Sequence, residues 1–142
     1  MTKCCGKAIA EVESITFQSN DFKFEVEAFL TQPVGRTQDS KHPLIVIIHG
    51  GPHSQQGPAF NFKSQVYAAR GWATLMVNYR GSTGYGREFR DLLRGEWGIA
   101  DVEDCAAVCR HLVERGDVDP DRLCIRGGSA GGGTGSSPVA RL

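Results

Sequence analysis

Residues 127–131, with the sequence GGSAG, are the part of this chain best suited to covalent chemistry. They fit the pattern G-x-S-x-G, in which a serine stands on a sharp turn between a strand and a helix. Glycines on both sides of the serine permit a strained backbone and keep bulky side chains away from the hydroxyl. The pattern therefore predicts that Ser129 is a nucleophile for attack on a carbonyl carbon.

A second motif, HGGP at residues 49–52, directly follows the apolar run 44–48. Attack on a carbonyl places negative charge on its oxygen, and fixed N–H groups stabilise that charge. Two glycines after a strand let backbone amides turn toward a substrate. The amide of Ala130, next to the nucleophile, is an expected second donor. Taken alone, HGGP also fits a tight structural turn.

A third motif, NYRGSTGYG at residues 78–86, follows another apolar run, 73–78. Loops at the carboxyl ends of parallel strands gather around one crevice, so the three motifs are expected to converge there. By composition alone the third motif is a glycine-rich turn. The glycines around Ser129 do not match a phosphate-binding loop, because Thr134 and Arg126 occupy positions where such loops need lysine and glycine. No cofactor is expected.

A nucleophilic serine needs a base, yet the sequence after Ser129 contains no Asp, Glu or His. The histidines at positions 42, 49, 53 and 111 all precede the serine. A general base must come within ~2.6–3.2 Å of the hydroxyl. His49 and His53 belong to the oxyanion side of the crevice, whereas the base approaches from the other side. The sequence therefore predicts a nucleophile without the Asp and His of a catalytic triad.

Hydrophobic periodicity predicts the elements that position these motifs. Alternating polar and apolar residues over 11–18 and 22–30, joined by the turn 19–21, predict an antiparallel hairpin with one solvated face. Further along, apolar strands alternate with amphipathic helices, which implies a parallel sheet with right-handed crossovers. The expected strands are 44–48, 73–78 and 122–126, and the expected helices are 60–69, 85–93 and 99–115.

Side-chain spacing also predicts how these helices pack. Helix 60–69 is expected to pack Phe62, Val66 and Ala69 on the sheet and to end at Gly71. The apolar face of helix 99–115 is expected to comprise Val102, Ala106, Cys109 and Val113. Residues 131–138 are not expected to be helical, because each glycine there costs about 1 kcal/mol relative to alanine and Pro138 opposes continuation.

Composition narrows the class of protein. A chain of 142 residues suits one domain, and sixteen basic residues balance sixteen acidic ones, which argues against nucleic acid or anionic membrane as a partner. No apolar run approaches the ~20 residues of a membrane span. The N-terminus lacks the apolar core of a secretory signal, so a cytoplasmic protein is expected.

The cysteines at 105, 109 and 124 lie in apolar patterns, where a free thiol acts as a small hydrophobe. Cys105 and Cys109 would share a helix face, but His111 would point away from it and a fourth ligand is lacking. No metal site is therefore expected.

Four segments together resemble the prolyl oligopeptidase family of serine peptidases, in particular its acylaminoacyl-peptidase and dipeptidyl-aminopeptidase-like branch. They are HPLIVIIHGGPHS (42–54), VNYRGSTGYG (77–86), WGIADVEDC (97–105) and DPDRLCIRGGSAGG (119–132). The resemblance implies a partial α/β-hydrolase fold, with an antiparallel hairpin followed by parallel strands and crossover helices, truncated after the nucleophile elbow. It further implies a disordered N-terminus (1–9), a peptidase S9-like domain (10–132) and an atypical flexible tail (133–142).

By this resemblance Ser129 matches the family's nucleophile, and Gly51 and Ala130 match its backbone oxyanion donors. The implied substrate is a short peptide or acyl-peptide, cleaved at a peptide or acyl-amino bond. The family's Asp and His would lie downstream of Ser129, so an inactive or incomplete fragment is expected. The β-propeller that precedes the hydrolase domain in the family has no counterpart in these residues.

Two other functions remain open. Half of a parallel sheet leaves an open edge, so the chain could be a non-catalytic binding or regulatory fragment that associates with itself or with a longer homologous chain. A small carboxylesterase-like hydrolase is the other alternative, although NYRGSTGYG favours peptidases.

Overall fold

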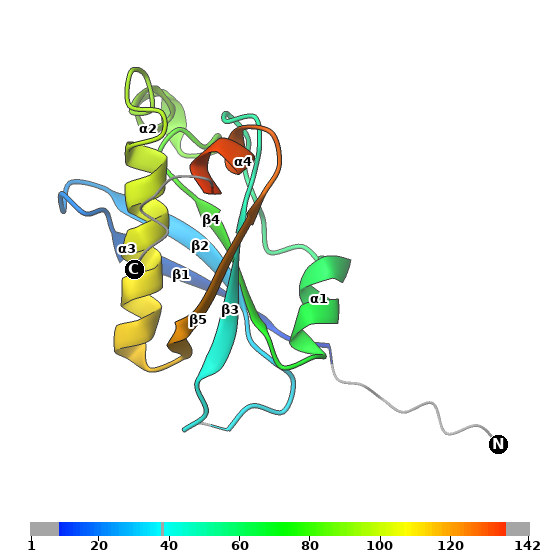
Figure 1. Cartoon of the computed structure of the whole chain (residues 1–142). Helices are drawn as coiled ribbons and strands as arrows, with labels where there is room; N and C mark the ends of the chain where they lie inside the picture. The colour runs from blue at the N-terminus through cyan, green and yellow to red at the C-terminus, as the bar shows by residue number, and fades with distance from the viewer. Residues whose placement is uncertain (1–8, 38, 136–142) are drawn as a thin grey trace.

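The computed structural model describes residues 9–37 and 39–135, which form one five-stranded sheet flanked by helices (Figure 1). The strands are arranged in the order β1-β2-β4-β3-β5. Helix α3 (Ala100–Arg115) lies on one side of the sheet and helix α1 (Phe62–Ala68) on the other (Figure 1). The main core lies between the sheet and α3, and its fully buried members include Val46, Leu75, Val108 and Leu112.

The predicted antiparallel hairpin is confirmed, but only its first strand has a solvated face, because most residues of the second strand are buried. Strands β1 (Val12–Gln18) and β2 (Glu25–Thr31) pair antiparallel. The alternate side chains Ile15 and Phe17 of β1 are buried. The turn between them is organised by the buried Ser19, whose hydroxyl oxygen accepts a hydrogen bond from the Phe24 backbone N–H at 3.1 Å. This turn therefore has a fixed shape beside the ends of the other strands.

The predicted parallel strands are also confirmed. Strand β3 (His42–Ile48) lies in the middle of a parallel set, with β4 (Ala73–Asn78) on one side and β5 (Val118–Gly127) on the other. Strand β5 is longer than predicted, because it begins at Val118 and includes Pro120. A proline is tolerated there since β5 lies at the edge of the sheet. Strand β2 joins the set by pairing antiparallel with β4.

Helix α1 presents a different face from the one predicted. It begins after Asn61, whose side-chain oxygen accepts from the Ser64 N–H at 3.1 Å, and this cap fixes the phase of the helix. The small residues Ser64 and Ala68 are buried, whereas Phe62 is 72% exposed. The prediction that Phe62 and Ala69 pack on the sheet is therefore wrong, since both are exposed and Val66 is half-buried, because the small residues Ser64 and Ala68 allow α1 to approach the sheet closely.

Helices α2 (Gly86–Asp91) and α3 follow the predicted segments 85–93 and 99–115. Helix α3 ends at Gly116, which adopts φ = 81° as a left-handed C-cap. Cys105 and Cys109 are buried on its apolar face as predicted, but Cys124 is exposed on β5. The prediction for Cys124 is wrong because the open edge strand leaves its side chain uncovered.

A short helix, α4 (Ala130–Gly135), forms where the glycine content predicted none. The Gly132 and Gly133 N–H groups donate to the Ser129 carbonyl, so the helix starts from the turn itself. Packing explains the glycine at 131, since a Cβ atom there would overlap the carbonyl oxygen of Ile48. The predicted tail 133–142 thus begins within α4, and the remainder of the tail and residues 1–8 lie outside the described residues.

Candidate active site

The candidate nucleophile sits on a strand–turn–helix junction, as its sequence pattern requires. Ser129 lies between the end of β5 at Gly127 and the start of α4 at Ala130, and it adopts φ = 56°. This left-handed conformation is uncommon for a residue with a side chain and is typical of strained functional turns. A Cβ atom at Gly127 would overlap the Gly131 carbonyl, so the tight turn depends on glycine.

The structure brings the HGGP loop against this turn. Ile48, at the end of β3, is paired with Gly127 of β5, so the two loops leave adjacent strands at one edge (Figure 1). A Cβ atom at Gly50 would lie 3.0 Å from the Gly128 carbonyl oxygen and 3.3 Å from the Ser129 Cβ. Gly51 follows with φ = 127°, a conformation that favours glycine. The predicted site residues Gly51, Ser129 and Ala130 therefore belong to loops in direct contact.

The NYRGSTGYG loop is fastened to the HGGP loop. The side chain of the fully buried Asn78 accepts from the Gln56 N–H at 2.7 Å and donates to the Gln56 carbonyl at 3.0 Å. The Thr83 N–H donates to the Ser54 carbonyl at 2.8 Å. These bonds confirm that the loops after β3 and β4 converge at the same edge of the sheet.

His49 is buried at this edge of the sheet, and its contacts do not suit the role of a general base. Its ring stacks on Tyr79 with centroids 4.5 Å apart, and Nε2 lies 2.9 Å from the Ser82 hydroxyl. The Tyr79 hydroxyl donates to the His49 carbonyl at 3.0 Å. Burial lowers the pKa of His49, so the ring is neutral at pH 7. His53 is engaged elsewhere, with Nδ1 2.8 Å from the Gly81 carbonyl.

A buried ion pair beside the site was missed by sequence reasoning. Arg80, only 7% exposed, directs Nε to Asp104 Oδ1 at 3.0 Å, and its backbone N–H donates to Asp104 Oδ2 at 2.8 Å. Asp104 is fully buried on α3. Burial raises the pKa of Asp104, and the hydrogen bonds and charge of Arg80 oppose that rise. The segment DVED (101–104) gave no sign that two of its carboxylates, Asp101 and Asp104, are buried.

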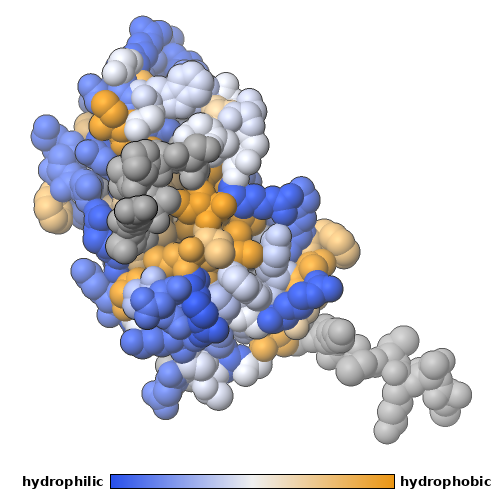
Figure 2. Space-filling model, in the orientation of Figure 1, coloured by the Kyte–Doolittle hydropathy of each residue, from blue (hydrophilic) through white to orange (hydrophobic). Residues whose placement is uncertain are grey.

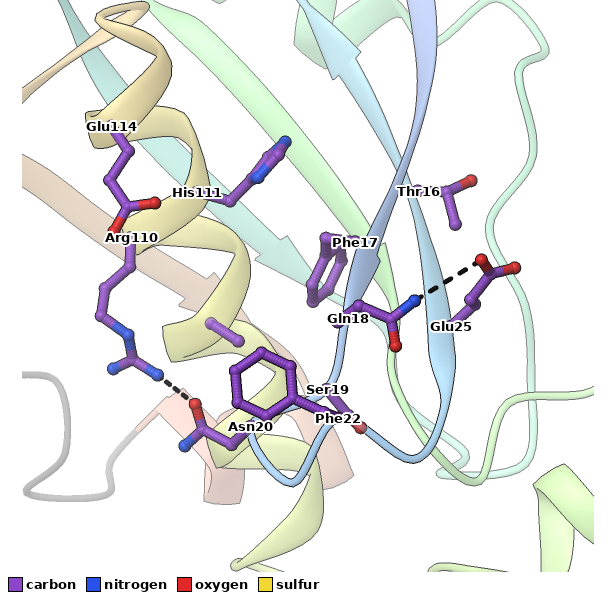
Figure 3. Close-up of a pocket in the computed structure, with 11 residues that line it drawn as sticks. Thr16, Phe17, Gln18, Ser19, Asn20, Phe22, Glu25, Arg110, His111 and Glu114 are labelled. Carbon is purple, nitrogen blue, oxygen red and sulfur yellow. Dashed lines mark hydrogen bonds between the residues drawn. The ribbon is translucent and has the colours of Figure 1, made fainter.

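A separate hollow lies between the β1–β2 hairpin and α3 (Figure 3). It has a volume of about 440 Å³, and Arg110 and Asn20 are hydrogen-bonded across its rim. Phe22 stands at the turn of the hairpin with φ = 57° and 80% exposure. None of the candidate site residues lines this hollow, so it is distinct from the centre around Ser129.

The profile of the prolyl oligopeptidase family matches residues 58–137, more than half of the 142 residues and including the Ser129 turn. The chain belongs to the prolyl oligopeptidase family. Among the relatives of this chain, an uncharacterised peptidase of Bacillus subtilis, YuxL, is 40% identical over 108 residues, which cover 75% of this chain and 16% of that protein. The acylamino-acid-releasing enzyme of Arabidopsis thaliana is 42% identical over 90 residues, covering 63% of this chain and 12% of that enzyme.

Solved structures of prolyl oligopeptidase family enzymes share the fold. Puromycin hydrolase superposes with a TM-score of 0.85 at 42% identity, over 90% of this chain and 20% of that chain. An acylaminoacyl peptidase in complex with a peptide chloromethyl ketone superposes with a TM-score of 0.74 at 29% identity. The match covers 86% of this chain and 20% of the peptidase chain. The partial α/β architecture agrees with these neighbours, and the chain spans about a fifth of their length.

Neither a membrane span nor a metal cluster is found among residues 9–37 and 39–135. No helix there is both long and apolar enough to cross a bilayer. Cys105 and Cys109 do not form part of any group of three or more potential metal ligands within the same residues.

Proposed function

We propose that this chain carries the nucleophile and the oxyanion donors of a serine-type peptidase that cleaves peptide or acyl-amino bonds. The observation that supports this most strongly is the left-handed Ser129, which follows the end of β5 and lies beside Gly50, after the end of the neighbouring parallel strand β3. Ser129 Oγ would attack the substrate carbonyl, and the backbone N–H groups of Gly51 and Ala130 would stabilise the oxyanion. The acylamino-acid-releasing enzymes and peptidases among its relatives agree with this substrate class.

We further propose that these 142 residues lack the base that would take the Ser129 proton. His49 and His53 are engaged with Ser82 and Gly81, and no Asp, Glu or His follows Ser129 in the sequence. Loss of a triad base removes most of the activation of the serine. The chain on its own is therefore expected to react with a fluorophosphonate probe no faster than its Ser129→Ala variant.

Chemical rescue with imidazole tests both the proposed nucleophile, Ser129, and the proposed absence of its base. Added imidazole can accept the Oγ proton as the serine attacks phosphorus and fluoride leaves, so it should accelerate labelling of the wild-type chain. The matched control Ser14→Ala changes an exposed serine on β1 and should label like wild type. Rapid labelling without imidazole would overturn the missing base, and rescue that persists in Ser129→Ala would overturn the nucleophile.

A second candidate function is that of a binding or regulatory fragment, favoured by the open edge at β5. Leu123 and Ile125 are only half-buried and Cys124 is exposed. Figure 2 shows hydrophobic residues gathered in the middle of the face that carries β5. A sheet edge of this kind invites pairing with another chain. Light scattering after size exclusion should then show a dimer or larger species, and a compact monomer at all concentrations would contradict association.

The same purified chain can be used to distinguish a peptidase from a carboxylesterase. In the presence of imidazole, turnover of a p-nitrophenyl ester without any turnover of a peptide p-nitroanilide would favour an esterase. The expected cytoplasmic location stays a prediction of the sequence.

A further inference from the structure

Arg80 lies between two residues that both contact His49. Tyr79 stacks on the imidazole and binds the His49 carbonyl, and the Ser82 hydroxyl lies against Nε2. His49 in turn directly precedes Gly50 and Gly51. Whatever fixes residues 79–82 therefore also fixes the HGGP loop beside Ser129.

Three carboxylates from two elements hold Arg80. Asp104 on α3 binds both Nε and the backbone N–H, and Glu103 on the same helix lies 3.2 Å from Nη2. Asp21, in the turn of the β1–β2 hairpin, lies 3.6 Å from Nη1. A planar guanidinium held by a buried carboxylate has little freedom to move. The loop is thus anchored to α3 at its backbone and at its side chain.

The tautomer of His49 follows from its two neighbours. Nδ1 lies 3.0 Å from the Gly50 carbonyl oxygen, which can only accept, so we assign the ring proton to Nδ1. Nε2 then needs a donor, and the Ser82 hydroxyl at 2.9 Å supplies one. That hydroxyl also lies 2.7 Å from the Tyr79 carbonyl, and it has one proton for these two acceptors. The Gly50 carbonyl therefore selects the tautomer, and donation from Ser82 to Nε2 supports it.

We propose that Arg80 is a positioning residue that acts through this tautomer on the oxyanion donor. The Gly50 carbonyl and the Gly51 N–H belong to one planar peptide unit, so a bond from Nδ1–H to that carbonyl also orients the N–H. By holding Ser82 against Nε2, Arg80 keeps the proton on Nδ1 and the Gly51 N–H in one direction. This relay, from Arg80 through Ser82 and His49 to the Gly51 N–H, consists of contacts within the fold. Its effect on catalysis rests on the proposed function.

The imidazole ¹⁵N chemical shifts of His49 at pH 7 test the relay, because they report which nitrogen carries the proton. Wild type is expected to show a proton on Nδ1. The double variant Arg80→Met/Asp104→Asn removes both charges of this buried pair, and it should shift His49 to a mixture of the two tautomers. The milder Arg80→Lys keeps a positive charge without the planar fork and should shift the pattern in the same direction.

Two controls separate positioning from stability. Ser82→Ala removes the donor to Nε2 and should reproduce the mixture. Arg115→Met breaks the ion pairs with Glu13 and Asp117 at a distance from His49, so it should lower stability and leave the tautomer unchanged.

The proposal is overturned if Arg80→Lys and the double variant are both folded and keep the wild-type ¹⁵N pattern. It is equally overturned if the wild-type ring carries its proton on Nε2. The measurement needs no substrate, so absence of labelling at Ser129 in the presence of imidazole would contradict the proposed function and leave this result standing.

Discussion

Gly131→Ala is expected to lower the free energy of unfolding by about 3 kcal/mol, near the upper end of the usual cost of overpacking. The added Cβ would overlap the Ile48 carbonyl oxygen and lie 2.9 Å from the His49 carbonyl oxygen. Both atoms belong to the main chain and cannot rotate away as a side chain would. The end of β3 and the start of α4 would have to separate, which would also open the contact between the HGGP loop and Ser129.

Gly133→Ala is the matched control, because it makes the same substitution two residues later in the same helix. A Cβ at Gly133 meets no atom within 4 Å. Alanine favours a helix over glycine by about 0.5–1 kcal/mol, so this variant should be slightly more stable than wild type. Urea unfolding would measure the free energy of unfolding of both variants, provided that the m-value is the same as in wild type. Equal shifts of the two midpoints would show that α4 does not press on β3.

Asn78→Leu is expected to cost about 3 kcal/mol, because it removes a buried side chain that satisfies both backbone groups of Gln56. A buried donor or acceptor left without a partner costs about 1–3 kcal/mol. The Tyr85 hydroxyl would also lose its bond from Asn78 Nδ2, although it would still donate to Glu27. Leucine has a similar branched shape, so the loss reflects hydrogen bonding more than volume.

Hydrogen exchange can locate this effect. The Gln56 amide should exchange much faster in Asn78→Leu than in wild type, and chemical denaturation should show the loss of stability. Asn20→Leu serves as a control, because Asn20 is exposed and its side chain accepts a hydrogen bond from the exposed Arg110 on α3. The stability of this variant should differ from wild type by no more than about 0.5 kcal/mol. Unchanged protection of Gln56 would mean that water or another group replaces the amide of Asn78.

Much of the scaffold follows from hydrophobic periodicity. The continuous apolar runs at 44–48 and 73–78 become the buried strands β3 and β4, and the three-and-four spacing at 99–115 becomes α3. The two strands are predictable because nearly all of their side chains are buried, and α3 is predictable because it buries one regular face. The face of α1 is not predictable in this way, since an N-cap and two small residues set its phase and leave Phe62 outside.

The candidate site is also only partly predictable from the sequence. Glycine patterns locate Ser129 and the HGGP loop, because those conformations exclude other residues. The links from Asp104 to Arg80 and from Ser82 to His49 leave no pattern, since their partners lie 24 and 33 residues apart. Helix propensity also fails at α4, where a close approach between main chains outweighs the preference of glycine for other conformations.

Strand β3 pairs with β5, and the two segments, 42–48 and 118–127, are separated by a complete strand and three helices. Closing so long a stretch of chain costs entropy before any contact between these strands is formed, and pairings of this kind are slow. During synthesis the hairpin and the β3–β4 pair leave the ribosome first. The turn that carries Ser129 thus acquires its shape last, and an incompletely folded chain does not yet hold Ser129 beside the HGGP loop.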